Sequence, residues 1–133
     1  MKSPYRIVAL LLLSLSVNNA HAYNKNQGSS SCEKPIFSEY QPAGNKYTQS
    51  FGSFSFIASS NTAPGSITVN VSAGENKFHF DAKALEIVQE KSGKFKVNGK
   101  LLRPIEHGFA RVSITAHSKP GCEHTDGYLI RIH

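Results

Sequence analysis

Four polar residues near the C-terminus are the side chains of this sequence best suited to hold a metal ion. They are His117, His124, Asp126 and His133, and imidazole nitrogens and carboxylate oxygens are common ligands of zinc and copper. If the last two strands pair as a hairpin, these side chains would come together. Their spacing matches no H-x₃₋₅-H, C-x₂-C or H-E-x-x-H motif. The alternative, which we favour, is a set of isolated surface histidines.

A basic run from 83 to 103 is the second feature with binding potential, since it holds six Lys or Arg against two Glu. Lys94, Lys96 and Lys100 alternate with apolar residues, which would place them on the solvent face of one strand. Such a face could bind an acidic protein, a glycan or a lipid headgroup through summed charge. The alternative, which we weight more heavily, is a solvated strand whose lysines prevent edge-to-edge aggregation. No nucleic acid is expected, because no aromatic platform accompanies the lysines.

Catalytic patterns are missing from the sequence. It has no G-x-S-x-G elbow around any serine and no paired arrangement of carboxylates that a sequence can reveal. We therefore predict that the protein is not an enzyme. We also expect no cofactor, with copper as the alternative.

The N-terminus has the layout of a secretory signal. Lys2 and Arg6 precede an apolar stretch over 7–17, and small residues follow at Ala20 and Ala22. The stretch is shorter than the roughly 18 apolar residues that a membrane span needs. We predict a signal peptide at 1–22, export to the periplasm or the medium, and a flexible polar leader at 23–31. Removal of Lys2 and Arg6 leaves 13 basic and 9 acidic side chains, a net charge of +4.

Two cysteines in an exported chain favour a disulfide over a metal site. We predict that Cys32 is bonded to Cys122, which would close nearly the whole mature chain. The chain-entropy model values such a closure at about 4 to 5 kcal/mol. The chain length after the signal suits one domain, expected at 32–133.

From Pro35 onward, alternating apolar and polar residues predict short β-strands separated by Gly, Pro, Asn and Ser turns. Eight strands are expected, at 35–40, 53–58, 66–72, 77–81, 85–90, 94–101, 109–117 and 128–132. This pattern favours an all-β, Ig-like β-sandwich of about seven to eight antiparallel strands.

One face of several strands is apolar and should form the core. The paired positions are Phe54 and Phe56; Ile67, Val69 and Val71; Phe78 and Phe80; Phe95 and Val97; Ala110, Val112 and Ile114; and Tyr128, Ile130 and Ile132. Most other aromatics should also be buried. Tyr47 and Phe51, which flank polar residues, are expected to be exposed.

Two short motifs give the chain a family resemblance. Pro42-Ala43 matches part of a Ser-x-Pro-Ala-x-Gly turn, with Tyr40 at the Ser position, and Asp126-Gly127 matches the start of an Asp-Gly-His motif, with Tyr128 at the His position. These features are distantly similar to the periplasmic copper-resistance CopC-like domains, whose Asp-Gly-His motif supplies a copper ligand. Those domains also open with a His a few residues before the turn, and that position falls near Lys34 here. The resemblance implies an Ig-like sandwich from 32 to 133.

The two cysteines fall near the two regions that the copper ligands join in that family. The resemblance therefore implies that a disulfide takes over the link that the metal makes there. We expect an exported, non-enzymatic Ig-like module that binds or supports another exported protein or an envelope component. The alternative is a periplasmic copper-binding or copper-handling protein. The only methionine is Met1, which argues against a thioether Cu(I) site.

Overall fold

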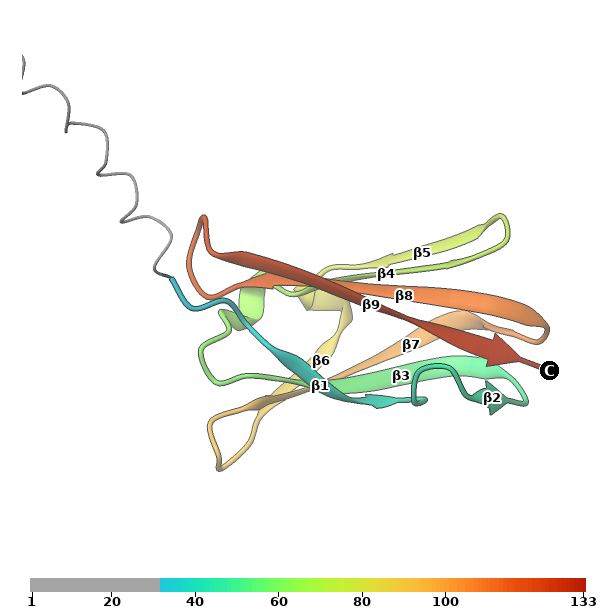
Figure 1. The fold of residues 1–133 in the computed structure, drawn as a ribbon, viewed down its shortest axis with the longest axis horizontal. Coiled ribbons are helices and arrows are strands. Elements are labelled where there is room, and N and C mark those ends of the chain that lie inside the picture. Colours follow the sequence, from blue (N-terminus) through green and yellow to red (C-terminus); the bar gives the residue numbers. More distant parts are fainter. Residues whose placement is uncertain (1–31) are drawn as a thin grey trace, which may run out of the picture. The chain divides into compact units, whose positions relative to one another are not determined.

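Strands account for most of the chain that the computed structural model describes, which is residues 32–133 (Figure 1). The predicted signal peptide (1–22) and leader (23–31) lie outside the described residues, so their boundaries stay predictions. Residues Glu33–His133 form one compact unit. No helix within residues 32–133 has the length and apolar content to cross a membrane.

The strands form two sheets that pack face to face. The four-stranded sheet has the order β1 (Phe37–Gln41), β3 (Phe51–Ala58), β7 (Phe95–Ile105), β6 (Glu86–Gln89). The five-stranded sheet has the order β2 (Tyr47–Thr48), β9 (Glu123–Ile132), β8 (Gly108–His117), β4 (Thr68–Ala73), β5 (Asn76–Phe80). Two single 3₁₀ turns, η2 (Pro64–Ser66) and η3 (Ala82–Ala84), connect strands. The predicted all-β sandwich is confirmed.

All eight expected strands are present, and the differences lie at their ends. Strand β2 was not expected, because two residues give no periodicity; this strand pairs with β9 in parallel. β9 begins at Glu123 rather than at Tyr128, although residues 123–127 lack an apolar face. Each of these residues pairs with β8, so the hydrogen-bonded ladder extends the strand beyond its local pattern.

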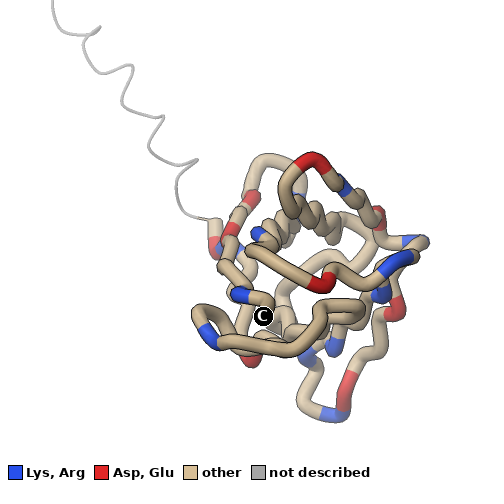
Figure 2. Tube along the Cα trace, turned by 90° about the vertical axis from the view of Figure 1, so that its right-hand side faces the viewer, with Lys and Arg blue, Asp and Glu red and all other residues tan. Residues whose placement is uncertain are grey.

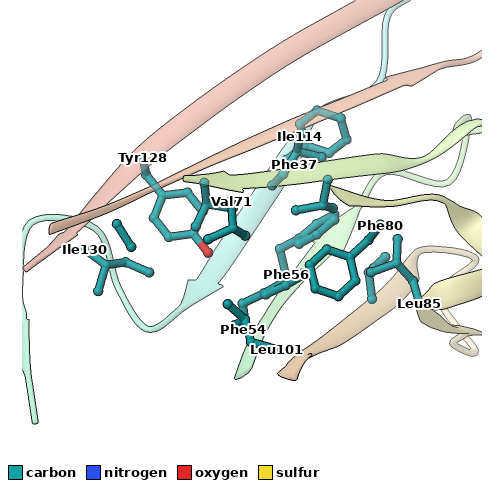
Figure 3. Close-up of a cluster of buried hydrophobic side chains, with 14 of the residues drawn as sticks. Phe37, Phe54, Phe56, Val71, Phe80, Leu85, Leu101, Ile114, Tyr128 and Ile130 are labelled. Carbon is teal, nitrogen blue, oxygen red and sulfur yellow. The ribbon is translucent and has the colours of Figure 1, made fainter. Parts of the chain in front are cut away.

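The predicted core faces are confirmed, with one correction among the aromatics (Figure 3). Tyr47 is exposed as expected, but Phe51 is fully buried at 0%. The reason is a register shift between Phe51 and Ser53 on β3. Between these pairs β3 advances by two residues while β7 advances by five, from Lys100 to Ile105. This irregularity interrupts the alternation, and Phe51 is buried together with Phe54.

Aromatic side chains join the two sheets. Phe54 of the four-stranded sheet meets Phe80 of the five-stranded sheet edge to face, with ring centroids 5.2 Å apart and planes at 82°. Phe54 pairs across the ladder with Gly99 of β7. Since Gly99 has no side chain, the Phe54 ring lies directly against the neighbouring strand.

The predicted disulfide between Cys32 and Cys122 is confirmed. It ties the segment that precedes β1 to the turn that precedes β9, and Cys122 is fully buried.

The Gly99→Ala substitution should destabilise the domain. A methyl group at Gly99 would lie 2.6 Å from Cε2 of Phe54, so the buried ring would have to leave its position. We expect a loss of about 1 to 3 kcal/mol in the free energy of unfolding, the usual range for overpacking, measured by urea denaturation. Gly65→Ala is the matched control, because nothing lies within 4 Å of its new methyl group. Equal stability of the two variants would contradict this packing.

Candidate functional site

The seam between β1 and β9 holds two of the four predicted metal ligands. His124 and Asp126 alternate on the same face of β9 as buried Tyr128, and both are half-buried. The Tyr40 hydroxyl donates a hydrogen bond to Oδ2 of Asp126 at 2.8 Å. The imidazole of His124 stacks on Phe37, with ring centroids 5.6 Å apart and planes at 21°.

Asp126 is committed to contacts within the domain. Its second oxygen, Oδ1, accepts a hydrogen bond from the Gly127 backbone N–H at 2.9 Å. The Tyr40 and Tyr128 rings pack with centroids 4.4 Å apart, which holds the Tyr40 hydroxyl beside the carboxylate. This carboxylate is therefore a structural acceptor that joins the two sheets.

Both tyrosine hydroxyls of the seam stay protonated at neutral pH. Burial raises the pKa of Tyr40 well above its usual range, and the hydrogen bond to Asp126 and its negative charge raise it further. Burial also raises the pKa of Tyr128. The Tyr128 hydroxyl oxygen is buried with no hydrogen-bond partner among the described residues.

The other two predicted ligands lie elsewhere. His117 pairs with Glu123 on β9, so it belongs to the opposite face of the sheet from His124. His133 follows the far end of β9, and nine residues of extended strand place it roughly 30 Å from His124. Its ring packs on Tyr47 with centroids 5.1 Å apart. The predicted set therefore does not converge.

Within residues 32–133, no group of three or more His, Cys, Asp or Glu is arranged to hold a metal ion. Tyr128, which the sequence resemblance aligns with the His of the Asp-Gly-His motif, packs in the core. The residues at this seam do not fit a metal centre of that kind.

The predicted basic face lies on the outer side of the four-stranded sheet. Lys94, Lys96, Asn98 and Lys100 point away from the core, because Phe95, Val97, Gly99 and Leu101 point into it. We call these four outward residues the lysine face.

Strand β7, which carries Lys96, Asn98 and Lys100, is not an edge strand at Lys96. It pairs with β3 on one side and with β6 on the other. Protection of a sheet edge therefore does not account for Lys96. Leu102, the next outward residue of β7, is 93% exposed.

An open hollow of about 730 Å³ adjoins the lysine face. A row of polar side chains in direct register crosses all four strands at this hollow: Gln41, Ser55, Asn98 and Glu86. Lys100, which pairs with Ser53, borders it. The hollow thus offers hydrogen-bond donors and acceptors, one cation and one carboxylate.

Three surface residues with binding potential were not singled out from the sequence: Leu102, Phe109 and Arg131. Phe109 is 57% exposed and is out of phase with Ala110, Val112 and Ile114. An apolar residue at a strand position where the alternation calls for a polar one is the sequence signal that identifies both Phe109 and Leu102. Arg131 could not have been singled out, because its partners come from distant segments.

The two packed sheets make the fold an all-β sandwich, and the comparison with solved structures finds a distant similarity to a CopC-like protein at the level of the fold. Among the matching chains is PcoC, a methionine-rich copper resistance protein from Escherichia coli. It shares 12% sequence identity with this chain at a TM-score of 0.52, over 76% of this chain and 100% of PcoC. No family model and no curated protein sequence matches the chain. The likeness is one of fold, and this chain has a single methionine.

Stability should fall at alkaline pH because of the seam tyrosines. Phenols in the unfolded chain ionise near pH 10, whereas the raised pKa values of Tyr40 and Tyr128 keep these groups protonated in the folded domain. Their contribution is therefore fully present below about pH 10 and is lost as the pH rises further. Urea midpoints measured from neutral to alkaline pH should fall above pH 10, and less steeply in Tyr40→Phe. In Asp126→Asn, tyrosinate absorbance should show a lower pKa for Tyr40. Identical pH profiles in all three proteins would refute this role of the tyrosines.

Proposed function

We propose that this protein is an exported, non-enzymatic Ig-like module that binds another exported protein or an envelope component. The observation that carries the proposal is the lysine face beside an open polar hollow on one outer surface of the sandwich. Export is supported by the disulfide, which is typical of oxidising compartments, and by the signal-like N-terminus.

The hollow supports binding better than catalysis. The residues that line it include one carboxylate, Glu86, and no histidine or cysteine. The titratable side chains among them are one carboxylate and one lysine, Lys100, whereas general acid–base catalysis most often uses a histidine or a pair of carboxylates. The row of serine, asparagine and glutamine side chains is instead suited to hold a polar surface in a defined register.

The charge of the lysine face favours an acidic partner. Lys94 and Lys100 are exposed, and summed positive charge attracts a negative surface over several ångströms. Leu102, exposed beside Lys100, adds an apolar contact that would become buried on binding.

The Lys94→Gln/Lys100→Gln double variant should weaken capture of the partner. Lys96 is left in place because it is half-buried. The mature protein would be immobilised and exposed to envelope extract of the host at low salt, where charge-driven contacts persist. We expect the apparent dissociation constant for captured partner to rise roughly tenfold in the variant.

The matched control is Lys34→Gln/Lys119→Gln, which removes the same charge at two other exposed positions. Its binding should stay within about twofold of that of the unaltered protein. Equal losses in the two double variants, or no captured partner at low salt, would refute the proposal.

Copper(II) binding is the second candidate, and the likeness of the fold to a copper resistance protein favours it. His124 and Asp126 share one face of β9, so they are the pair of predicted ligands best placed to act together. A metal ion would have to replace the Tyr40 hydrogen bond to Asp126. His117 and His133 lie elsewhere and would not join them.

Calorimetric titration with Cu(II) distinguishes the two candidates. Because both oxygens of Asp126 already accept hydrogen bonds, we expect a dissociation constant of roughly micromolar or weaker. Tyr40→Phe should bind copper more tightly, since it releases one oxygen. If copper is the ligand of this protein, the unaltered protein should instead bind Cu(II) tightly, and the His124→Ala variant should lose that binding.

A further inference from the structure

A second exposed surface lies on the outer side of the five-stranded sheet, where β2, β9 and β8 run side by side (Figure 1). In register, Tyr47 pairs with Arg131 and Arg131 pairs with Phe109, while Leu129 pairs with Arg111 in the adjacent row. We call these five residues the aromatic–arginine patch.

The side chains of the patch point to solvent. Tyr47 is 64% exposed and Phe109 is 57% exposed, whereas their strand neighbours Ala110, Ile130 and Ile132 are buried. Neighbouring strands lie about 4.8 Å apart, so the Arg131 position on β9 lies between the Tyr47 and Phe109 positions. The row therefore presents two exposed aromatic residues with one arginine between them.

Local contacts hold the patch in one arrangement. The Arg131 guanidinium carbon lies 5.9 Å from the centroid of the Tyr47 ring, and the His133 ring packs on the same tyrosine. The Arg131 and His133 backbone N–H groups donate to the Lys46 and Thr48 carbonyls at 3.3 and 3.0 Å. The Tyr47 and Arg131 side chains are thus supported before any partner arrives, which lowers the entropy cost of binding through them.

The charge of the patch has one sign. The row of Leu129 and Arg111 continues to Ser72 on β4 and Lys77 on β5. The two rows together carry Arg131, Arg111 and Lys77 and no carboxylate. Glu75 and Glu106 lie in the hairpin turns next to the patch, outside these rows. Figure 2 shows acidic and basic positions on several sides of the domain, so an all-basic pair of rows is a local feature.

We propose that the aromatic–arginine patch docks an acidic segment of a partner protein. Arg131 and Arg111 would receive carboxylates, which the planar guanidinium binds through two parallel hydrogen bonds. Tyr47 and Phe109 would cover an apolar side chain of the same segment. Tyr, Phe and Arg are the residues enriched in the centre of protein interfaces.

A glycan fits this surface less well than a protein does. Sugar rings stack on a free aromatic face, and both Arg131 and His133 already lie against Tyr47. The patch lies on the opposite sheet from the lysine face, so this inference goes beyond the proposed function and adds a second, independent docking surface.

The test uses ¹⁵N-labelled mature protein and a synthetic ten-residue peptide of alternating glutamate and leucine as the probe. At low salt we expect saturable shifts of the amide signals of residues 47–48, 109–111 and 129–131. Arg131→Gln and Arg111→Gln should each raise the dissociation constant at least fivefold, and Phe109→Ser should act likewise with its melting temperature nearly unchanged. Two arginine variants are used so that one unstable protein does not decide the result.

Matched controls show whether the peptide binds at this surface and through its charge. The Lys94→Gln/Lys100→Gln variant should bind the peptide within twofold of the unaltered protein, which keeps this test independent of the lysine face. A glutamine–leucine peptide should cause no saturable shifts. Absence of saturable shifts, shifts centred on β7, or equal binding of the neutral peptide would overturn the proposal. The proposal would also be overturned if the acidic peptide does not bind while phosphatidylglycerol vesicles occupy the patch. Occupation of the patch by a second copy of the protein in sedimentation, again without peptide binding, would have the same consequence.

Discussion

The packing of Phe54 against Gly99 and Phe80 is the contact on which the rest of the structure depends. Phe54 lies on its own sheet at Gly99 and touches the facing sheet at Phe80, so one ring fixes the distance and alignment of the two layers. Once the inner faces are joined, strand alternation sends every second residue outward. The lysine face and the aromatic–arginine patch are the outward products of this arrangement, one on each sheet.

The seam between β1 and β9 shows how a polar position in this fold can serve structure. Tyr40 and Asp126 are 86 residues apart in sequence, yet their hydrogen bond joins strands of different sheets. A carboxylate that accepts two hydrogen bonds is satisfied without a metal ion. The disulfide between Cys32 and Cys122 secures the same end of β9 covalently. Two kinds of link, one polar and one covalent, therefore hold the β1 side of the sandwich to β9.

The two outer surfaces differ in the chemistry that they offer. The lysine face combines mobile point charges with a polar hollow, whereas the patch combines rigid guanidinium groups with exposed aromatic rings. Lysines favour long-range attraction and tolerate several partners, while arginine and aromatic side chains favour a defined contact.

The sequence by itself determined the all-β class, the inward faces of the strands, the disulfide partners and the outward position of the lysines, because each follows from a period of two or from a pair of cysteines. Tertiary structure decided the burial of Phe51, since the register between β3 and β7 shifts between Phe51 and Ser53. It also separated His133 from His124 and aligned Tyr47, Arg131 and Phe109 in one row. These outcomes depend on the register between strands that are distant in sequence, and no local pattern of residues contains that register.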